Sequence, residues 1–229
     1  MPHTVHALFA FMLLMLAIPP SASAEGPSPE DIARRVEAFY SDRADIRAQF
    51  TQQVRKPGRR RMVTKVGRVF FKRPGMMRWE YTEPEPVFYI SDGNVLWSYQ
   101  PEDQLVTRLN VRSSELYHQS RYLFGQGDLT EDFELSRGEA LEEEADLYPL
   151  VLSPRQGSAE LKSLTLYVHL ETGEIRRTQL IDPYDNLSVI RFERVEYRVM
   201  EESVFEFTPP PLARIQDLSR PEAATNREQ

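Results

Sequence analysis

The sequence feature that most constrains the fold is the stretch Phe70 to Pro101, where aromatic residues are frequent but the chain is never uniformly apolar. From Met77 to Tyr81, apolar and polar residues alternate strictly. Successive side chains of a β-strand point to opposite faces. The alternation therefore predicts a half-buried strand that carries Met77, Trp79 and Tyr81 on one face.

A β-hairpin is predicted in the second part of the same stretch. Asp92-Gly93 lies between two runs rich in β-forming residues, and this dipeptide tolerates the positive φ angles that a two-residue turn requires. Six side chains then share one face, in the pairs Ile90 with Val95, Phe88 with Trp97 and Pro86 with Tyr99. A turn at Gly93-Asn94 would change the partners but keep the same faces.

The rest of the chain is predicted to be mainly β with two helices. Ser28-Pro29-Glu30-Asp31 has the capping hydroxyl, proline and acid of a helix start, and apolar residues follow it at helical spacing as far as Tyr40. An antiparallel meander is predicted from Asp45 to Val111, and a short helix from Ser113 to Phe124. Further strands are predicted at residues 133–135, 147–152, 164–170, 175–181 and 190–192, with turns at Thr172-Gly173 and Asp182 to Asn186.

The N-terminal residues predict export. Residues 7–18 form an apolar run too short to span a bilayer, and Ala22-Ser23-Ala24 supplies the small residues of a cleavage site. We expect a cleaved signal peptide over residues 1–24, a single domain over residues 25–218 and a disordered tail over residues 219–229. Because residues 1–6 contain neither Lys nor Arg, an uncleaved anchor is the alternative.

Composition and motifs exclude several classes of function. The net charge of −7 argues against a nucleic-acid partner, and the absence of cysteine excludes disulfides and a lipidated cysteine. His118 and His169 lie far apart, without a second histidine at metal-ligand spacing, and the sequence contains no G-x-S-x-G nucleophile motif. We therefore predict a protein that is not an enzyme and has no cofactor and no metal. The acidic run Glu142 to Glu144 is interpreted as a solvated loop.

Several motifs, taken in order, give the chain a resemblance to a known family. Those in the central stretch are Lys72-Arg73-Pro74-Gly75, Arg78-Trp79-Glu80-Tyr81, Asp92-Gly93, Leu96-Trp97 and Tyr99-Gln100-Pro101. Those outside it are Phe50-Thr51-Gln52-Gln53, Leu150-Val151-Leu152-Ser153-Pro154 and Phe205-Glu206-Phe207-Thr208-Pro209-Pro210. In order and spacing they resemble the periplasmic lipoprotein carrier family, LolA. Asp185 departs from the family pattern, because the family usually has glycine before the asparagine of this turn.

The resemblance implies a fold and a function. The fold is a mainly β (α+β) one: an incomplete, strongly curved antiparallel β-barrel that encloses an apolar cavity and is closed by a lid of short helices. The function is that of a soluble, monomeric periplasmic chaperone. It accepts acylated lipoproteins from an ATP-driven releasing complex in the inner membrane and delivers them to an outer-membrane lipoprotein receptor.

The resemblance also turns the aromatic pattern into a candidate site. Without it, the aromatic and methionine side chains would be an ordinary core; with it, they are expected to line the acyl-chain cavity. The predicted lining residues are Phe50, Val69, Phe71, Met77, Trp79, Tyr81, Phe88, Ile90, Trp97 and Tyr99. Arg73, which has the strand parity of Val69 and Phe71, matches the family arginine that holds the lid closed by hydrogen bonds. The alternative is that Arg73 has no such role and extends into solvent at the strand end.

Three alternatives remain open from the sequence. The same fold could carry another lipid or a glycolipid, or it could act as an envelope-stress sensor that binds a signalling protein. The basic run around Pro57-Gly58, formed by Arg55, Lys56 and Arg59 to Arg61, is either a solvated hairpin turn or a contact for anionic headgroups or an acidic partner.

Overall fold

The computed structural model describes residues 26–219 except 42, 44, 115, 116, 118–126, 157, 159 and 160. The predicted signal peptide, most of the helix predicted from Ser113, and residues 220–229 of the predicted tail lie outside the described residues. One 12-stranded sheet has the order β12-β6-β5-β4-β3-β2-β1-β11-β10-β9-β8-β7. Its strands are β1 Ile46–Arg55, β2 Val63–Lys72, β3 Met76–Glu83, β4 Val87–Asp92, β5 Val95–Gln100, β6 Leu105–Asn110, β7 Phe133–Arg137, β8 Leu147–Pro154, β9 Ser163–His169, β10 Ile175–Ile181, β11 Leu187–Tyr197 and β12 Arg214–Asp217.

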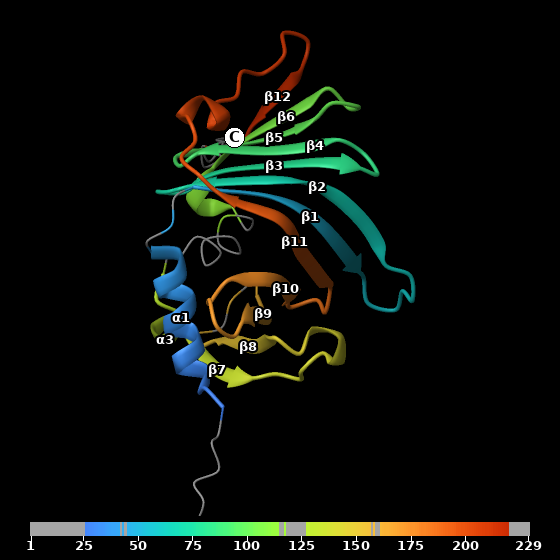
Figure 1. Cartoon of the computed structure of the whole chain (residues 1–229). Helices are drawn as coiled ribbons and strands as arrows, with labels where there is room; N and C mark the ends of the chain where they lie inside the picture. The colour runs from blue at the N-terminus through green and yellow to red at the C-terminus, as the bar shows by residue number, and fades with distance from the viewer. Residues whose placement is uncertain are drawn as a thin grey trace, which may run out of the picture.

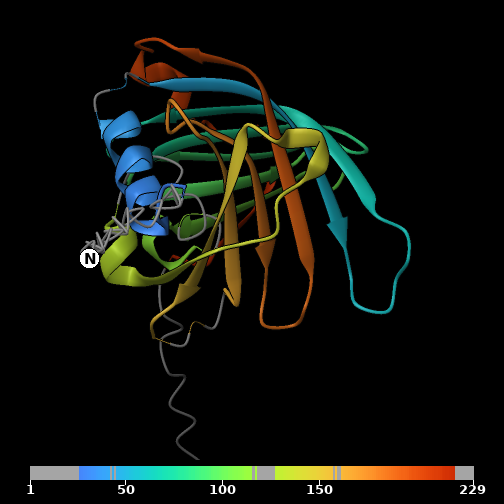
Figure 2. The same ribbon diagram turned by 60° about the horizontal axis from the view of Figure 1, so that its bottom comes forward.

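The sheet is an open, strongly curved barrel. Neighbouring strands are antiparallel except β12, which pairs with β6 in parallel. β12 and β7 are the two edges, so the barrel does not close through them. Strands β1–β6, here the larger half, face strands β7–β10, the smaller half, and β11 runs between the two (Figures 1 and 2). The prediction of an incomplete antiparallel barrel is confirmed.

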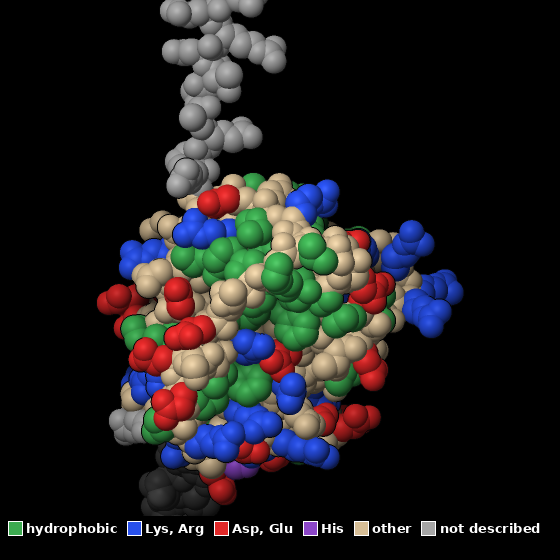
Figure 3. Space-filling model, turned by 90° about the horizontal axis from the view of Figure 1, so that it is seen from above, with side chains coloured by type: hydrophobic (Ala, Val, Ile, Leu, Met, Phe, Trp, Pro, Cys, Tyr) green, Lys and Arg blue, Asp and Glu red, His purple; other side chains and the backbone are tan. Residues whose placement is uncertain are grey.

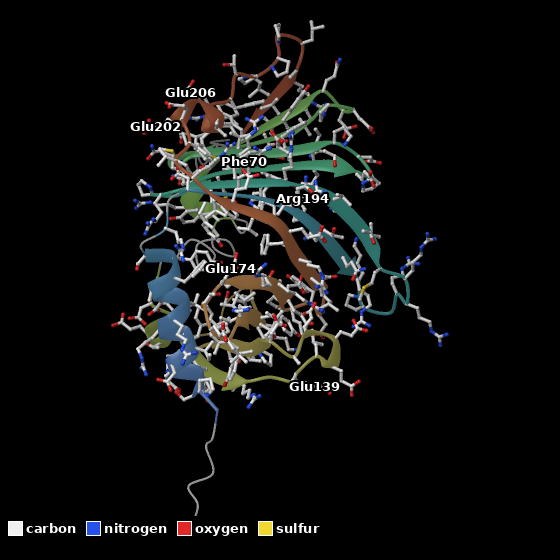
Figure 4. All side chains as sticks on the ribbon, in the orientation of Figure 1. Phe70, Glu139, Glu174, Arg194, Glu202 and Glu206 are labelled. Atoms are coloured by element: carbon white, nitrogen blue, oxygen red, sulfur yellow. The ribbon has the colours of Figure 1, made fainter. Side chains whose placement is uncertain are left out.

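A bulge in β11 contributes to the curvature. Arg47 of β1 pairs with Glu196, but Gln49 pairs with Glu193, so β11 has one residue more than β1 over this interval. Arg194, labelled in Figure 4, adopts a φ of 50° within the bulge. An extra residue of this kind bends a strand and increases its twist. The bulge therefore lies where the larger half turns toward the smaller one.

Helix α1, Pro29–Ser41, runs along one end of the smaller half, and its C-terminal end points toward the larger half (Figure 1). Its N-terminus has the predicted reciprocal cap: the Asp31 amide donates to Ser28 Oγ at 3.1 Å, and the Ser28 amide donates to Asp31 Oδ2 at 3.2 Å. The Ser28 hydroxyl donates to Asp31 Oδ2 at 2.9 Å, and this bond, together with that from the Ser28 amide, holds the pKa of Asp31 below its ordinary value. The stripe of Ile32, Ala33, Val36 and Tyr40 is buried in the main core. α1 thus closes one end of the curved sheet with an apolar face.

A C-terminal arm, residues 198–213, covers the outer face of the larger half. It contains the short 3-10 helix η4, Glu202–Phe205, whose ends lie near the labelled Glu202 and Glu206 in Figure 4. Arg78 donates to the Val204 carbonyl at 3.2 Å and, through Nε, to Glu80 Oε1 at 2.7 Å. The sequence did not predict this arm or β12. Figure 3, viewed from this side, shows the hydrophobic side chains gathered there, and Leu212 and Val199 are among the exposed ones.

The remaining short elements complete the connections between strands. They are the 3-10 helices η1 Val111–Ser113 and η3 Glu142–Glu144, and helix α3 Leu129–Asp132. The prediction that Glu142 to Glu144 is simply a solvated loop is wrong for Glu144. Its side chain is 11% exposed and forms ion pairs with Arg191 and Arg177. The turn at Asp182 to Asn186 is confirmed, and Asp185 adopts the positive φ of 61° that glycine usually supplies.

Candidate functional site

The candidate site is the inner face of the larger half, which lies beneath α1 and opposite the smaller half. Strand register fixes which side chains share it, because directly paired residues point to the same side. One row runs from Ala48 through Val69 and Trp79 to Tyr89. The neighbouring rows contain Phe50, Gly67, Tyr81 and Val87 on one side and Phe71, Met77, Ser91 and Leu96 on the other. Six predicted lining residues are therefore brought together here: Phe50, Val69, Phe71, Met77, Trp79 and Tyr81.

Aromatic rings form the centre of this face. The ring centroids of Phe50 and Trp79 are 5.0 Å apart, those of Phe71 and Trp79 are 5.5 Å apart, and both pairs meet edge to face. Tyr81 stacks on Trp79 at 6.3 Å and meets Phe50 at 5.0 Å. Phe50, Phe71, Met77 and Trp79 are each at most 3% exposed. These side chains form an apolar surface that is covered in the closed structure.

One small apolar cavity is formed by described residues beneath α1. A cavity of about 20 Å³ lies between α1 and the sheet, and Tyr40, Val69, Phe71, Ile175 and Phe192 are among its lining residues. This is room for about one water molecule. The cavity, as the described residues form it, is therefore too small for an acyl chain.

A second, more polar cavity lies at the end of the larger half remote from α1. It has a volume of about 180 Å³ and is lined by Gln52, Lys65, Tyr81, Glu83, Pro84, Glu85, Val87 and Tyr89. Lys65 Nζ lies 5.4 Å from the centroid of the Tyr81 ring. Burial raises the pKa of Tyr81 well above its ordinary value, so its hydroxyl stays neutral. Of these described cavities, the one beneath α1 is apolar and the one at the end of the larger half remote from α1, here called the mouth, is polar.

Four predicted lining residues lie elsewhere: Phe88, Ile90, Trp97 and Tyr99. They do share one face, because the hairpin turn is at Gly93-Asn94 and pairs Ile90 with Trp97 and Phe88 with Tyr99. That face is the outer one, since Ile90 pairs with Arg78 and Phe88 with Glu80. The Phe207 ring of the C-terminal arm packs at 5.8 Å from Trp97 and 5.7 Å from Tyr99. The prediction that these four line the cavity is therefore wrong: the arm covers them and gives them a second apolar environment.

Matched truncations on the two faces should separate stability from binding. Met77 on the inner face is 0% exposed and Ile90 on the outer face is 1% exposed. We expect Met77→Ala and Ile90→Ala each to lower the free energy of unfolding by about 2–4 kcal/mol. Only Met77→Ala should change the affinity for an apolar fluorescent dye, measured by titration below the unfolding transition. A comparable affinity change in Ile90→Ala would contradict the assignment of the faces.

Arg73 follows β2 directly and reaches the end of α1. Its Nη2 donates to the Ser41 carbonyl at 2.9 Å and to the Arg43 carbonyl at 2.8 Å. The last turn of α1 contains no basic residue. The Arg73 guanidinium therefore supplies the positive charge that the negative end of the helix dipole favours. These are the partners that the sequence alone could not name.

Three further hydrogen bonds join α1 to the smaller half of the sheet and to α3. Arg35 donates to the Leu170 carbonyl at 2.6 Å, and the Tyr40 hydroxyl accepts from the Ile175 amide at 3.1 Å. The Leu129 amide, at the start of α3, donates to Glu37 Oε1 at 2.9 Å. Glu174, which Figure 4 places beside α1, accepts a hydrogen bond from the Tyr197 hydroxyl at 2.7 Å. Burial raises the pKa values of Tyr40 and Tyr197 above their ordinary values. α1 is thus anchored to the smaller half and joined to β2 through Arg73.

No group of three or more His, Asp or Glu residues within the described part of the chain is arranged to hold a metal ion. Across the described ranges, no helix is both long enough and apolar enough to cross a membrane.

Comparison with known proteins identifies the family. Residues 42–208 match the family model described as outer membrane lipoprotein carrier protein LolA. The chain belongs to the LolA family. An outer-membrane lipoprotein carrier protein of Alkalilimnicola ehrlichii is 29% identical over 89% of this chain and 90% of the relative. The carrier protein of the same name from Dechloromonas aromatica is 28% identical over 75% of this chain and 81% of the relative.

The fold also has a counterpart among solved structures. An uncharacterized conserved protein of Thermus thermophilus aligns with a TM-score of 0.54 at 14% identity, over 82% of this chain and 98% of that one. At this identity the likeness concerns the fold alone. It supports the open, curved sheet as a stable architecture, while the family membership of the chain rests on the match to the LolA model.

Proposed function

We propose that this LolA-family chain is a periplasmic carrier that binds acylated lipoproteins released from the inner membrane and delivers them to a receptor at the outer membrane. The observation that carries the proposal is the buried apolar inner face, together with helix α1, whose end Arg73 joins to β2. The carrier performs no covalent chemistry: its work is to hide acyl chains from water during transit. An ATP-driven complex supplies the cargo upstream.

The energetics favour an interior that opens and closes. Burying an acyl chain contributes roughly 0.8 kcal/mol per methylene, so one long chain contributes on the order of 10 kcal/mol before opposing costs. A carrier with a permanently open apolar groove would hold such cargo too tightly to release it. Closing the empty interior recovers packing among the inner-face side chains, which offsets part of the binding energy and favours transfer.

Arg73 is proposed to hold the closed state. Its two hydrogen bonds link β2 to the end of α1, while Arg35, Glu37 and Tyr40 fix the helix to the smaller half and α3. If the end of α1 separates from β2, the two Arg73 bonds break and the hydrogen bonds of Arg35, Glu37 and Tyr40 remain. Entry of an acyl chain beneath α1 would supply the apolar contacts that replace the lost packing.

A release assay tests the proposed function directly. We expect the purified chain without residues 1–24, added to spheroplasts, to bring acylated lipoproteins into the soluble fraction, and we expect an apolar dye bound to it to be displaced by acylated but not by deacylated lipoprotein. The readouts are immunoblots of the supernatant and dye fluorescence. Displacement by deacylated protein at equal concentration would show that the acyl group is not what the interior binds. Mass spectrometry of the soluble complex would reveal a lipid or glycolipid cargo instead.

A further inference from the structure

The indole nitrogen of Trp79 is a polar atom in an apolar interior. Trp79 is 1% exposed, and its Nε1 is buried without a hydrogen-bond partner. Its neighbours on the inner face include the rings of Phe50, Phe71 and Tyr81. An indole N–H can only donate, and a buried donor without an acceptor destabilises the structure that contains it. Packing alone does not explain this group, because an apolar ring could fill the core without an unpaired donor.

The position of Trp79 lies between the two ends of the interior. Its row of the sheet continues through Val69 toward Ala48, both of which line the apolar cavity beneath α1. On the other side it stacks on Tyr81, which lines the polar cavity at the mouth. The polar cavity also contains Gln52, whose Oε1 is buried and lacks a partner. An acyl chain directed toward α1 would therefore have its polar end near Trp79.

We propose that the Trp79 indole N–H donates a hydrogen bond to the carbonyl oxygen of the bound acyl group, an ester or an amide. The donor that is unpaired in the closed, empty interior then finds its acceptor in the cargo. This inference rests on the proposed function and adds to it a chemical selectivity: the interior recognises the acyl linkage as well as the hydrocarbon chain. A dialkyl ether of the same length offers the same apolar surface but no carbonyl.

Ester and ether probes test the proposal on the wild-type chain. The probes are dioctanoylphosphatidylglycerol and its dioctyl ether analogue, each used below its critical micelle concentration. With ¹⁵N-labelled indoles, the sequence gives two signals, one each from Trp79 and Trp97. Trp97 on the outer face is the internal reference, and Trp97→Phe assigns the two signals. We expect the ester probe to move the Trp79 indole proton downfield, and the ether probe to leave it near its position in the empty protein.

Affinity provides the second readout. One net hydrogen bond corresponds to a preference of about fivefold to tenfold for the ester probe over the ether probe in calorimetric titration. Trp79→Phe should lower the affinity for both probes to a common value, because it removes packing as well as the donor, and should thereby abolish the preference. If the phenylalanine variant is unstable, benzothienylalanine incorporated in the Trp97→Phe background keeps the bicyclic shape and removes only the N–H.

The possible outcomes distinguish failure of the Trp79 hydrogen bond from failure of the proposed carrier function. Equal affinity for both probes with an unmoved Trp79 signal overturns the hydrogen bond and leaves the carrier function standing. Failure of the wild-type chain to bind either probe counts against the acyl-binding interior, and the hydrogen bond falls with it. A downfield shift with the ester probe, together with a preference that Trp79→Phe abolishes, supports both.

Discussion

Gly67→Ala is expected to lower the free energy of unfolding by about 3 kcal/mol, because the inner face has no space for a methyl group at this position. A Cβ atom there would lie 2.2 Å from the Glu80 carbonyl oxygen on β3 and 2.8 Å from Cζ of Phe50. The first of these atoms belongs to the backbone of a paired strand and cannot move without breaking the ladder. The ring of Phe50 would have to leave its place against Trp79.

Thermal unfolding measures this effect. For a chain of this length, the expected loss corresponds to a fall in Tm of roughly 6–12 °C. Gly26→Ala is the matched control, because nothing lies within 4 Å of a Cβ at Gly26, and it should leave the Tm unchanged. We also expect Gly67→Ala to alter the dye affinity, since the displaced Phe50 is part of the site. A Tm within 1 °C of the wild type (roughly 0.3 kcal/mol) would show that the inner face is more loosely packed than the contacts indicate.

The inner face could be predicted because its signal is local. The alternation from Met77 to Tyr81 assigns a face to each side chain of β3, and the cap at Ser28 with the stripe to Tyr40 specifies α1. Hydrophobic periodicity needs no knowledge of distant residues. The same holds for the turn near Gly93, whose register changed by two residues without changing the faces.

The position of Phe88, Ile90, Trp97 and Tyr99 on the outer face could not be predicted, because it depends on residues far away along the chain. Aromatic residues on β4 and β5 look alike in the sequence whether an α-helix and a second half of the sheet or a C-terminal arm covers them. The covering segment contains Val204 and Phe207, more than 100 residues away from Ile90 along the chain. The distinction depends on the turn between Glu83 and Val87, which pairs Tyr81 with Val87 and so places Tyr89 inside and Phe88 outside. Without that pairing, the sequence pattern allows either Phe88 or Tyr89 to face inward.

Arg73→Leu is expected to increase cargo loading and to reduce cargo transfer by about fivefold or more, if the two bonds to α1 stabilise the closed state by roughly 1 kcal/mol. This stabilisation of the closed state is modest because the Arg73 side chain is exposed, and competition with water weakens its hydrogen bonds. Loss of the bonds to Ser41 and Arg43 makes opening easier, so acyl chains enter more readily. Closing then contributes less to their expulsion, so the complex persists when the acceptor is present.

The control variants define which property of Arg73 matters. Arg73→Lys keeps the charge near the end of α1 but cannot reproduce the planar set of donors that reaches two carbonyls, so its transfer should lie between those of wild type and Arg73→Leu. Arg34→Leu removes another exposed arginine, one paired with Asp31 at the opposite end of the same helix, and should transfer normally. Loading and transfer are measured at matched folded stability, with lipoprotein followed from the soluble complex to acceptor-containing vesicles.

The two halves of the Arg73 prediction distinguish a latch from a merely structural contact. A structural loss would weaken the folded state and reduce loading and transfer together, whereas release of a latch moves them in opposite directions. The anchoring of α1 to the smaller half through Arg35 and Tyr40 is what permits this separation, because the helix retains its place when Arg73 is lost. Wild-type loading and wild-type transfer in Arg73→Leu would leave Arg73 as an arginine that only caps the helix end. Arg35→Ala, by contrast, should lower the Tm, since it loosens the helix from the half to which it belongs.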